Sequence, residues 1–360
     1  MTAPLTIMWI RGNDNLVFNH PTRYFCLGII GAGKSSWLEC LGEQYLKEGA
    51  TILDLYGSRR GEGLAWLRSS WAKTKRILLL HSENVDVKSS FETKNLGQLT
   101  LKDLETYGII ISASPLYISP SQEFQEINKV LDLLYSRLTW NKLVYTIVRE
   151  ASNLFYSRLR VNQNQLQSKA EAIYLVRESR HMGLSMGTDS LKLTSVDIDM
   201  RILCDYQAIK SMGIWGLPDG LEWLYHVINQ AFIRKMPKKA FVILSKNGAI
   251  EIGKFNEIPW HHQEKENIVR AVGLKIDYGE EPVLAKDRRT FKTISDAEHV
   301  EIMALYLDDR QSMAKIQKLK KRSRSTIHAQ ITAHNEAVAR SGFCPKCQRV
   351  HGEHAKESTE

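Results

Sequence analysis

The stretch GIIGAGKS, residues 28–35, matches the pattern G-x-x-x-x-G-K-[ST] at every fixed position. An apolar run, RYFCL at residues 23–27, precedes it, and residues 33–49 follow with apolar residues at helical spacing. A strand, a glycine-rich turn and a helix in this order present backbone amides and a helix N-terminus to phosphate. The residues predicted to bind the nucleotide are Gly28, Gly31, Ala32, Gly33, Lys34, Ser35 and Ser36.

Two side chains of this loop carry the specific chemistry. Lys34 is expected to reach the β- and γ-phosphates, and the Ser35 hydroxyl is expected to ligate Mg²⁺. The sequence therefore predicts ATP and Mg²⁺ as cofactors. A glycine-rich turn entering an unrelated helix is the alternative, and the flanking strand and helix patterns argue against it.

The rest of the first 255 residues has the pattern of an α/β sheet domain. Apolar runs lie at residues 24–30, 51–57, 76–82, 108–114, 143–148 and 183–188, and helical patterns lie at 33–49, 121–138 and 165–183. Continuous apolar strands alternating with amphipathic helices indicate a parallel sheet with helices on both faces. After Gly216, the pattern predicts a helix at 219–236 and a hairpin at 240–255 around an Asn-Gly pair. We assign residues 1–255 to this domain and 256–292 to a linker.

Composition limits the setting in which the protein works. The chain has 360 residues, a net charge of +9 and five scattered cysteines, and it contains no apolar run of 18 residues. An odd number of cysteines without a framework favours a reducing compartment. The first residues also lack the pattern of a secretory signal. We expect a cytoplasmic protein, in a host cytoplasm if it is viral, with no membrane partner.

The end of the apolar run at 143–148 raises the main chemical question, because Arg149 and Glu150 follow it. A phosphate-hydrolysing site needs one carboxylate for the magnesium shell and another to position water. Glu150 is placed for the second role, whereas the permanent cation of Arg149 repels Mg²⁺. Three interpretations stay open: Asp54 and Ser35 hold the magnesium shell; Arg149 contacts phosphate or its own sheet and turnover is slow; or the pair belongs to a surface turn and the acid lies elsewhere. Asp54 itself could instead start a turn.

The order of these motifs resembles the FtsK/HerA superfamily of P-loop ATPases, which includes DNA translocases, conjugation coupling proteins and viral genome-packaging motors. The resemblance covers residues 20 to about 235. It rests on four stretches: GIIGAGKS, ILDLYG, IVREASNL and VRESRHMGLSMGTDS. It implies a P-loop NTPase (RecA-like) sheet, ATP hydrolysis, double-stranded DNA as partner and a homo-oligomeric ring, a hexamer in the family.

The resemblance also implies roles for individual residues. Glu150 would activate water, Arg180 would be an arginine finger for a neighbouring subunit, and Thr188 would lie at the γ-phosphate sensor position. Two positions depart from the family pattern: Arg149 replaces an Asp, and Asp189 replaces a Gln. We therefore hypothesise that Asp189 supplies the acid lost at position 149. Arg180 could instead be an ordinary cation at a helix end.

Residues 293–340 predict a second, basic module. Residues 286–350 contain 14 Lys and Arg against 7 Asp and Glu. Three short helical patterns, beginning at Ser295, Ser312 and Thr326, resemble a helix-turn-helix DNA-binding module. The residues predicted to contact DNA are Lys321, Arg322, Arg324, Ser325 and Thr326 at phosphate, with His328 and Gln330 at base edges. A small helical cap with a solvated basic face is the alternative.

The tail at 341–360 predicts a zinc knuckle. Cys344 and Cys347 have the spacing of two thiolate ligands, and His351 and His354 lie within reach along the chain. Three local ligands with one from elsewhere, or free thiols in a tail, are the alternatives. A bound Zn²⁺ would be structural, because the tail is too short to bury a core.

These patterns together predict an ATP-dependent DNA translocase or genome-packaging motor acting on double-stranded DNA. The alternative from another class is a DNA-binding nucleotide switch, a regulator or partition factor with little hydrolysis. A small-molecule kinase shares the phosphate loop but would not need the basic C-terminal module.

Overall fold

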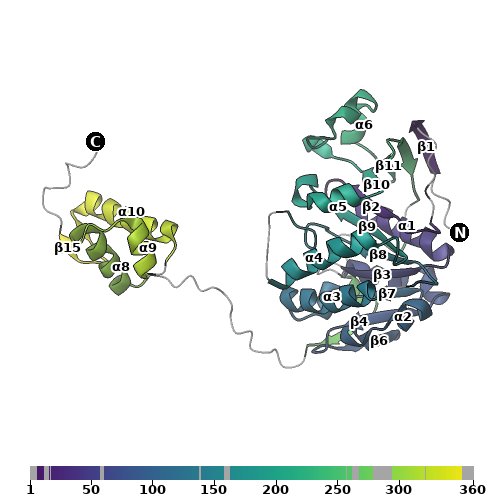
Figure 1. Ribbon diagram of the computed structural model, residues 1–360, viewed down its shortest axis with the longest axis horizontal. Coiled ribbons are helices and arrows are strands. Elements are labelled where there is room, and N and C mark those ends of the chain that lie inside the picture. The colour runs from purple at the N-terminus through teal and green to yellow at the C-terminus, as the bar shows by residue number, and fades with distance from the viewer. Residues whose placement is uncertain are drawn as a thin grey trace. The chain divides into compact units, whose positions relative to one another are not determined.

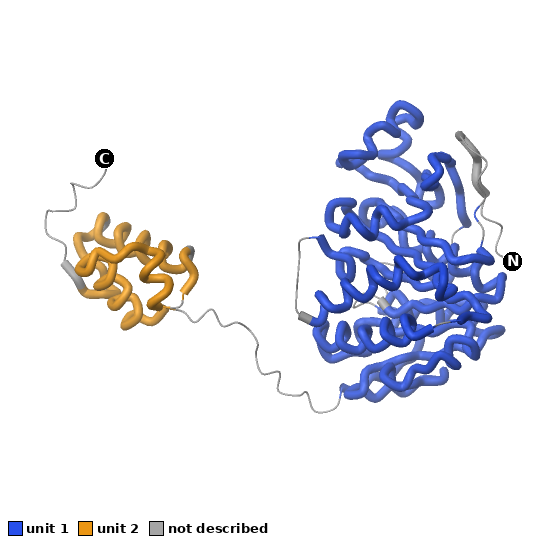
Figure 2. The backbone as a smooth tube through the Cα atoms, in the orientation of Figure 1, with its two compact units in different colours: residues 1–281 blue, residues 282–360 orange. Residues whose placement is uncertain are grey.

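The computed structural model divides the chain into two compact units, residues 1–281 and 282–360 (Figures 1 and 2). It describes residues 6–11, 16, 18–56, 61–137, 139–157, 163–256, 258–261, 267–278, 294–320 and 322–350. No helix in these ranges is both long and apolar enough to cross a membrane.

Unit 1, residues 1–281, is built on one mixed sheet of eleven strands in the described part of the chain. From β10 to β6 neighbouring strands run parallel, whereas β10, β11, β12 and β1 pair antiparallel at one edge. The spatial order is β1 (Thr6–Arg11), β12 (Ile250–Lys254), β11 (Ala240–Ser245), β10 (Tyr206–Ile209), β2 (Arg23–Leu27), β9 (Leu184–Ser190), β8 (Val144–Val148), β3 (Thr51–Tyr56), β7 (Ile109–Ile111), β4 (Ile77–His81) and β6 (Glu92–Asn95).

Helices cover both faces of this sheet. The crossover from β2 to β3 and those from β7 to β8 and β8 to β9 run in opposite directions along the sheet. Because such crossovers are right-handed, α1 (Lys34–Lys47) lies on one face, and α3 (Pro120–Tyr135) and α4 (Gln163–Glu178) lie on the other (Figure 1). Shorter elements complete the unit: α2 (Leu101–Thr106), α5 (Ile198–Leu203), α6 (Gln230–Arg234), α7 (Ile268–Ala271), and the 3₁₀ turns η1 (Glu62–Arg68), η2 (Ser70–Lys73), η3 (Leu96–Gln98), η4 (Ser114–Leu116), η5 (Leu193–Ser195), η6 (Gly213–Trp215) and η7 (Glu222–His226).

Aromatic side chains fix α1 against the sheet. Trp37 and Tyr45 of α1 are fully buried, and the Tyr45 ring stacks on Tyr145 of β8 with ring centroids 4.6 Å apart. Gly187 of β9 leaves the space for that tyrosine, since a Cβ at this position would lie 2.0 Å from the Tyr145 hydroxyl. The helix that follows the phosphate loop is therefore held over β8 and β9.

The α/β prediction is confirmed, including the six apolar strands, which are β2, β3, β4, β7, β8 and β9, and the Asn-Gly hairpin, which is β11 and β12. The single helix predicted at 219–236 is wrong, because the segment forms η7 and α6 separately. The Asn229 side chain accepts a hydrogen bond from the Ala231 amide and so begins a new helix. The short strand β10 was not predicted.

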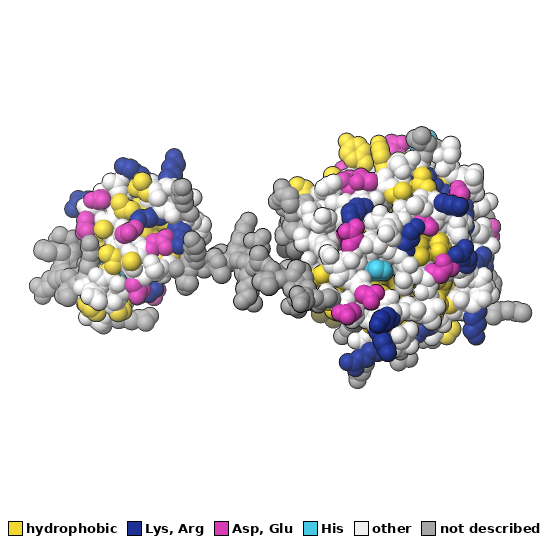
Figure 3. Space-filling view, turned by 90° about the horizontal axis from the view of Figure 1, so that it is seen from below, with side chains coloured by type: hydrophobic (Ala, Val, Ile, Leu, Met, Phe, Trp, Pro, Cys, Tyr) yellow, Lys and Arg dark blue, Asp and Glu magenta, His cyan; other side chains and the backbone are white. Residues whose placement is uncertain are grey.

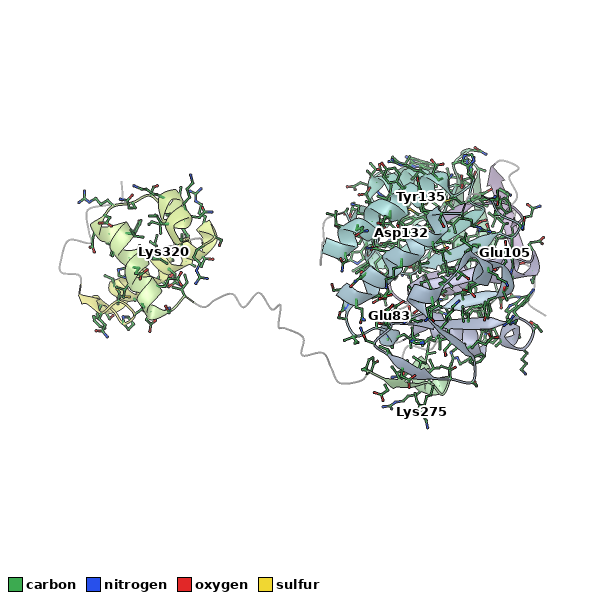
Figure 4. All side chains as sticks on the ribbon, turned by 60° about the horizontal axis from the view of Figure 1, so that its bottom comes forward. Glu83, Glu105, Asp132, Tyr135, Lys275 and Lys320 are labelled. Carbon is green, nitrogen blue, oxygen red and sulfur yellow. The ribbon has the colours of Figure 1, made fainter. Side chains whose placement is uncertain are left out.

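The segment predicted as a linker, residues 256–292, is partly folded onto unit 1. It contributes α7 and the strand β13 (Lys275–Asp277), which pairs antiparallel with β5 (Asp86–Lys88). Lys275 of β13 projects from the edge of unit 1 (Figure 4). Three residues are too few to give a strand pattern in the sequence, which therefore predicts a linker here.

Unit 2, residues 282–360, is a small helical module. It contains α8 (Asp296–Met303), a turn of π-helix η8 (Ala304–Asp308), α9 (Met313–Lys320), α10 (Arg324–Ser341), and a short hairpin of β14 (Phe343–Cys344) and β15 (Arg349–Val350). The Ser295 side chain accepts from the Glu298 amide and begins α8, as the sequence predicts. Its core is small: Ile302, Met303, Ile316, Ile327, Ile331 and the two cysteines Cys344 and Cys347.

Candidate nucleotide-binding site

The phosphate loop connects β2 to α1 and needs glycine at two crowded positions. Gly31 and Gly33 have positive φ angles of 75° and 86°, and a Cβ at Gly33 would lie 2.8 Å from the Lys238 carbonyl oxygen. At Gly28 a Cβ would lie 2.7 Å from the Cβ of Lys210. The loop backbone therefore packs closely against Lys210 and Lys238, and a side chain at Gly28 or Gly33 would clash with them.

The side chain of Lys34, the lysine of the phosphate loop, packs against the loop itself. Lys34 is only 7% exposed, and its Nζ donates to the Ile29 carbonyl at 3.3 Å. Ser35 is half-buried in the first turn of α1, and Ala32 and Ser36 complete the turn. The seven predicted loop residues are thus contiguous at the N-terminus of α1, the end of a helix that attracts anions.

The strand order places the loop at a switch point of the sheet. From β2 the chain crosses to β3, three strands away, and β9 and β10 flank β2 on its two sides. Ligands of open α/β sheets bind at the carboxyl ends of the strands where the order reverses. Because Asp189 of β9 pairs in register with Cys26 of β2, Asp189 lies on the strand directly beside the one that leads into the loop.

Asp189 and Glu150 are joined at this edge. The Asp189 Oδ1 accepts from the Glu150 amide at 2.6 Å, and the Asp189 carbonyl accepts from the Ala151 amide at 2.6 Å. Burial raises the pKa of the Asp189 carboxyl, while nearby Lys34 acts to lower it. Burial and the Asp189 charge raise the pKa of Glu150, and Lys34 again opposes this. The two acids and the loop lysine therefore form one electrostatic group.

Glu150 holds an uncommon backbone conformation. Its φ angle is 51°, in the left-handed region that side chains with a Cβ rarely adopt. Such conformations cost roughly 1–3 kcal/mol and persist where the surrounding structure imposes them, which is often at functional sites. At Glu150 the bond from its amide to Asp189 is part of what imposes it.

Arg149 turns away from this group into a buried ion cluster. Its Nη2 lies 2.6 Å from Asp54 Oδ2 and 2.8 Å from Glu39 Oε1, and its Nε donates to Asp54 Oδ1 at 3.3 Å. All three side chains are at most 2% exposed. Arg149 therefore joins β8, β3 and α1, and of the three interpretations the contact with its own sheet describes it.

The prediction that Asp54 belongs to the magnesium shell is corrected by the same cluster. Both carboxylate oxygens of Asp54 are bound by Arg149, and Oδ2 also accepts from Trp66 Nε1 at 3.0 Å. The remaining oxygen of Glu39 lies 2.5 Å from His261 Nδ1. Asp54 is an internal partner of a cation, so Asp189 is the better placed of the two candidate acids.

Arg180 and Thr188 do not join the group around Lys34. Arg180 lies 3.1 Å from Asp205, which also binds Arg23, the first residue of β2. Arg180 is therefore at the amino ends of the strands, opposite the phosphate loop of its own chain. Thr188 is fully buried, and its hydroxyl donates to the Tyr24 carbonyl at 3.2 Å. Their roles as arginine finger and sensor stay predictions.

Sequence reasoning missed a lysine that supports the loop from behind. Lys210 is fully buried, with Nζ donating to the carbonyls of Lys238 at 2.6 Å and Ala240 at 2.5 Å. Burial lowers its pKa to about 8. Its Cβ is the atom that requires Gly28. The only sequence signal was a Lys directly after a short apolar strand.

Two of the residues predicted to contact DNA have other partners in unit 2. The Arg322 guanidinium lies 2.6 Å from Glu298 Oε2, and Gln330 Oε1 accepts from His299 Nδ1 at 2.9 Å. Both side chains are engaged inside the module, and their contacts with DNA stay predictions. Arg324 and His328 are exposed and Thr326 is half-buried at the start of α10, whereas Lys321 and the Ser325 side chain lie outside the described residues.

The surface of unit 2 carries mixed charge on the face in Figure 3, where Lys and Arg side chains are interspersed with Asp and Glu. Lys320, labelled in Figure 4, pairs with Glu301. Cys344 and Cys347 lie in the terminal hairpin, and His351 and His354, predicted to be zinc ligands, lie outside the described residues. DNA binding by this module therefore stays a prediction.

No family model and no curated protein matches this sequence. Among solved structures, the genome packaging NTPase B204 from Sulfolobus turreted icosahedral virus 2, in complex with AMPPCP, is similar at 14% identity and a TM-score of 0.40, over 66% of this chain and 98% of that chain. The pCW3 conjugation coupling protein TcpA, with ATPγS, is similar at 12% identity and a TM-score of 0.41, over 70% and 65%.

Proposed function

We propose that this chain is an ATPase in which Lys34, Asp189 and Glu150 form the reaction site. The observation that carries the proposal is the hydrogen bond between the Glu150 amide and Asp189, on the strand beside the phosphate-loop strand. It holds one acid close to the loop and sets the backbone of the other. A phosphate-binding loop with two adjacent carboxylates is the minimal equipment for hydrolysis of a nucleotide.

Each residue of the proposed site has its own role in nucleotide hydrolysis. The loop amides and Lys34 hold the phosphates, and Glu150 orients the attacking water and takes its proton. Burial and the Asp189 charge raise the pKa of Glu150, which makes it a stronger proton acceptor than an exposed glutamate. The Ser35 hydroxyl and the Asp189 carboxylate are hard oxygen donors that suit Mg²⁺, which would neutralise charge on the phosphates. A buried carboxyl whose pKa is raised by burial is also a group that a cation would favour in its charged form.

We further propose that hydrolysis drives movement of double-stranded DNA and that the protein acts as a ring. The sequence resemblance supports this. In addition, large apolar side chains are exposed around the phosphate loop: Ile30 at 78%, Ile214 at 82% and Trp215 at 81%. The backbone contact from the Ile29 amide to the Ser211 carbonyl joins their two segments. A neighbouring subunit docked over the nucleotide would cover these side chains and would bring its own Arg180 toward the site.

The competing proposal, a nucleotide switch, rested on Arg149 as a sign of lost hydrolysis. Arg149 is engaged with Asp54 and Glu39, and Asp189 offers another acid, so that reason no longer holds. Steady-state ATP hydrolysis by the full chain, with and without long duplex DNA, separates the two. We expect turnover that rises severalfold with DNA and is lost in Lys34→Ala. Tight ATP binding without turnover in either condition would overturn the ATPase and favour the switch.

A further inference from the structure

Four metal-binding side chains converge inside unit 2, from parts of the chain up to 48 positions apart. His299 of α8, His334 of α10, and Cys344 and Cys347 of the terminal hairpin are all buried, and their ligand atoms lie within 4.8 Å of one another. Within the described residues, this is the group of His, Cys, Asp or Glu side chains that lie close enough together to hold a metal ion. We propose that these four residues bind one structural Zn²⁺.

The distances fit tetrahedral coordination. Cys344 Sγ lies 3.6 Å from His299 Nε2, and Cys347 Sγ lies 3.4 Å from His334 Nδ1. With Zn–S of about 2.3 Å and Zn–N of about 2.0–2.1 Å, the sulfur-to-nitrogen edge of a tetrahedron is ~3.6 Å. Both edges are therefore close to the length that a shared zinc ion requires.

The ring of His299 is oriented by a second contact. Its Nδ1 hydrogen is donated to Gln330 Oε1 at 2.9 Å, so the lone pair is on Nε2, the atom that faces Cys344. Histidines that bind metals usually donate the other ring hydrogen in this way, which fixes tautomer and orientation. In the proposed site, Gln330 therefore orients His299.

The local fold explains how the ligands meet. Gly342 ends α10 with a φ angle of 66°, and its amide donates to the Val338 carbonyl. The chain thus turns back, and the hairpin of β14 and β15 brings Cys344 and Cys347 against His334 on the same helix. His299 completes the set from α8, so a metal ion here would join the first helix, the last helix and the hairpin.

The core of unit 2 is small, so a metal ion that joins its helices and hairpin would stabilise it. Besides the two cysteines, its buried apolar core consists of five residues: Ile302, Met303, Ile316, Ile327 and Ile331. Domains of this size often depend on a metal or disulfides because their cores are small. Two thiolates and two imidazoles without a carboxylate are a ligand set typical of Zn²⁺, and four protein ligands leave no open position for catalysis.

The test compares two ligand sets in the full chain. Zinc per chain is measured by mass spectrometry after gel filtration, in the wild type, His299→Gln, His334→Gln, and the double variant His351→Gln/His354→Gln. His328→Gln is the matched control, since His328 is an exposed histidine on α10. We expect about one zinc in the wild type, the control and the double variant, and a loss of roughly fivefold or more in the two single variants.

A second readout covers variants that fail to fold. A chelator removes zinc from the wild-type chain, and Co²⁺ is added in its place. The visible spectrum should then show the intense bands of tetrahedral Co²⁺ bound by two thiolates. A wild type that binds neither Zn²⁺ nor Co²⁺ would overturn the proposal. So would zinc lost only in the His351→Gln/His354→Gln variant, which would restore the linear ligand set predicted from the sequence.

Discussion

Glu150→Gln is expected to lower kcat for ATP hydrolysis by about 10²–10⁴-fold, the usual contribution of a positioned general base. Glutamine keeps the size of the side chain and the backbone amide that donates to Asp189, but it cannot take a proton from water. Nucleotide affinity should change little, because the phosphates are held by the loop and Lys34. Steady-state hydrolysis and equilibrium binding of a fluorescent ATP analogue measure the two quantities separately.

The matched control for this variant is Glu178→Gln, an exposed glutamate at the end of α4. Its kcat should equal that of the wild type. If Glu150→Gln also retained full turnover, Glu150 would not be the base, and the left-handed backbone at this position would have only a structural origin.

Arg149→Met is expected to destabilise unit 1 by about 3–5 kcal/mol, because removing one partner of a buried ion cluster leaves uncompensated charge. Asp54 and Glu39 would remain buried beside each other without their shared cation. All eight tryptophans of the chain precede residue 282, so urea unfolding followed by tryptophan fluorescence reports on unit 1.

Two further variants sharpen this prediction. Arg177→Met removes the half-exposed pair with Asp199 and should cost less than about 1 kcal/mol, because solvent screens that pair. Arg149→Asp restores the acid that the sequence resemblance expects, yet it would add a third carboxylate to the cluster, so we expect it to unfold unit 1 rather than raise activity. An Arg149→Met protein as stable as Arg177→Met would contradict the structural role of Arg149.

The fold was predictable because its signals are local. The loop pattern at 28–35 fixes a strand and a helix, and the six apolar runs mark the buried parallel strands. The partners of Arg149 could not be predicted from the sequence. Asp54 is 95 positions away from Arg149, and nothing in the helical pattern around Glu39 marks it as the partner of a buried cation. Only the packing of α1 on the sheet brings the three together.

The positions of the two buried histidines of unit 2, His299 and His334, were also difficult to predict from the sequence. The spacing of Cys344 and Cys347 predicts two zinc ligands, and the histidines nearest to them in sequence, His351 and His354, are the predicted partners. His334 does continue the apolar stripe of Ile327 and Ile331 at helical spacing, which indicated a buried histidine. His299 precedes Ile302 and Met303 in the same way. Helical periodicity therefore accounts for the burial of His299 and His334, whereas distance along the chain does not.

The role of Asp189 is tested by measuring how much Mg²⁺ strengthens the binding of a non-hydrolysable ATP analogue to the wild type and to Asp189→Asn. Asparagine keeps an oxygen for the Glu150 amide but loses the charge. We expect Mg²⁺ to tighten binding in the wild type and Asp189→Asn to lose about 10–100-fold of that gain, equivalent to ~1.5–3 kcal/mol for a charged contact. Binding without Mg²⁺ should not weaken, because the substitution removes a negative charge near Lys34. A full magnesium effect in Asp189→Asn would contradict the claim that Asp189 replaces the acid absent at position 149.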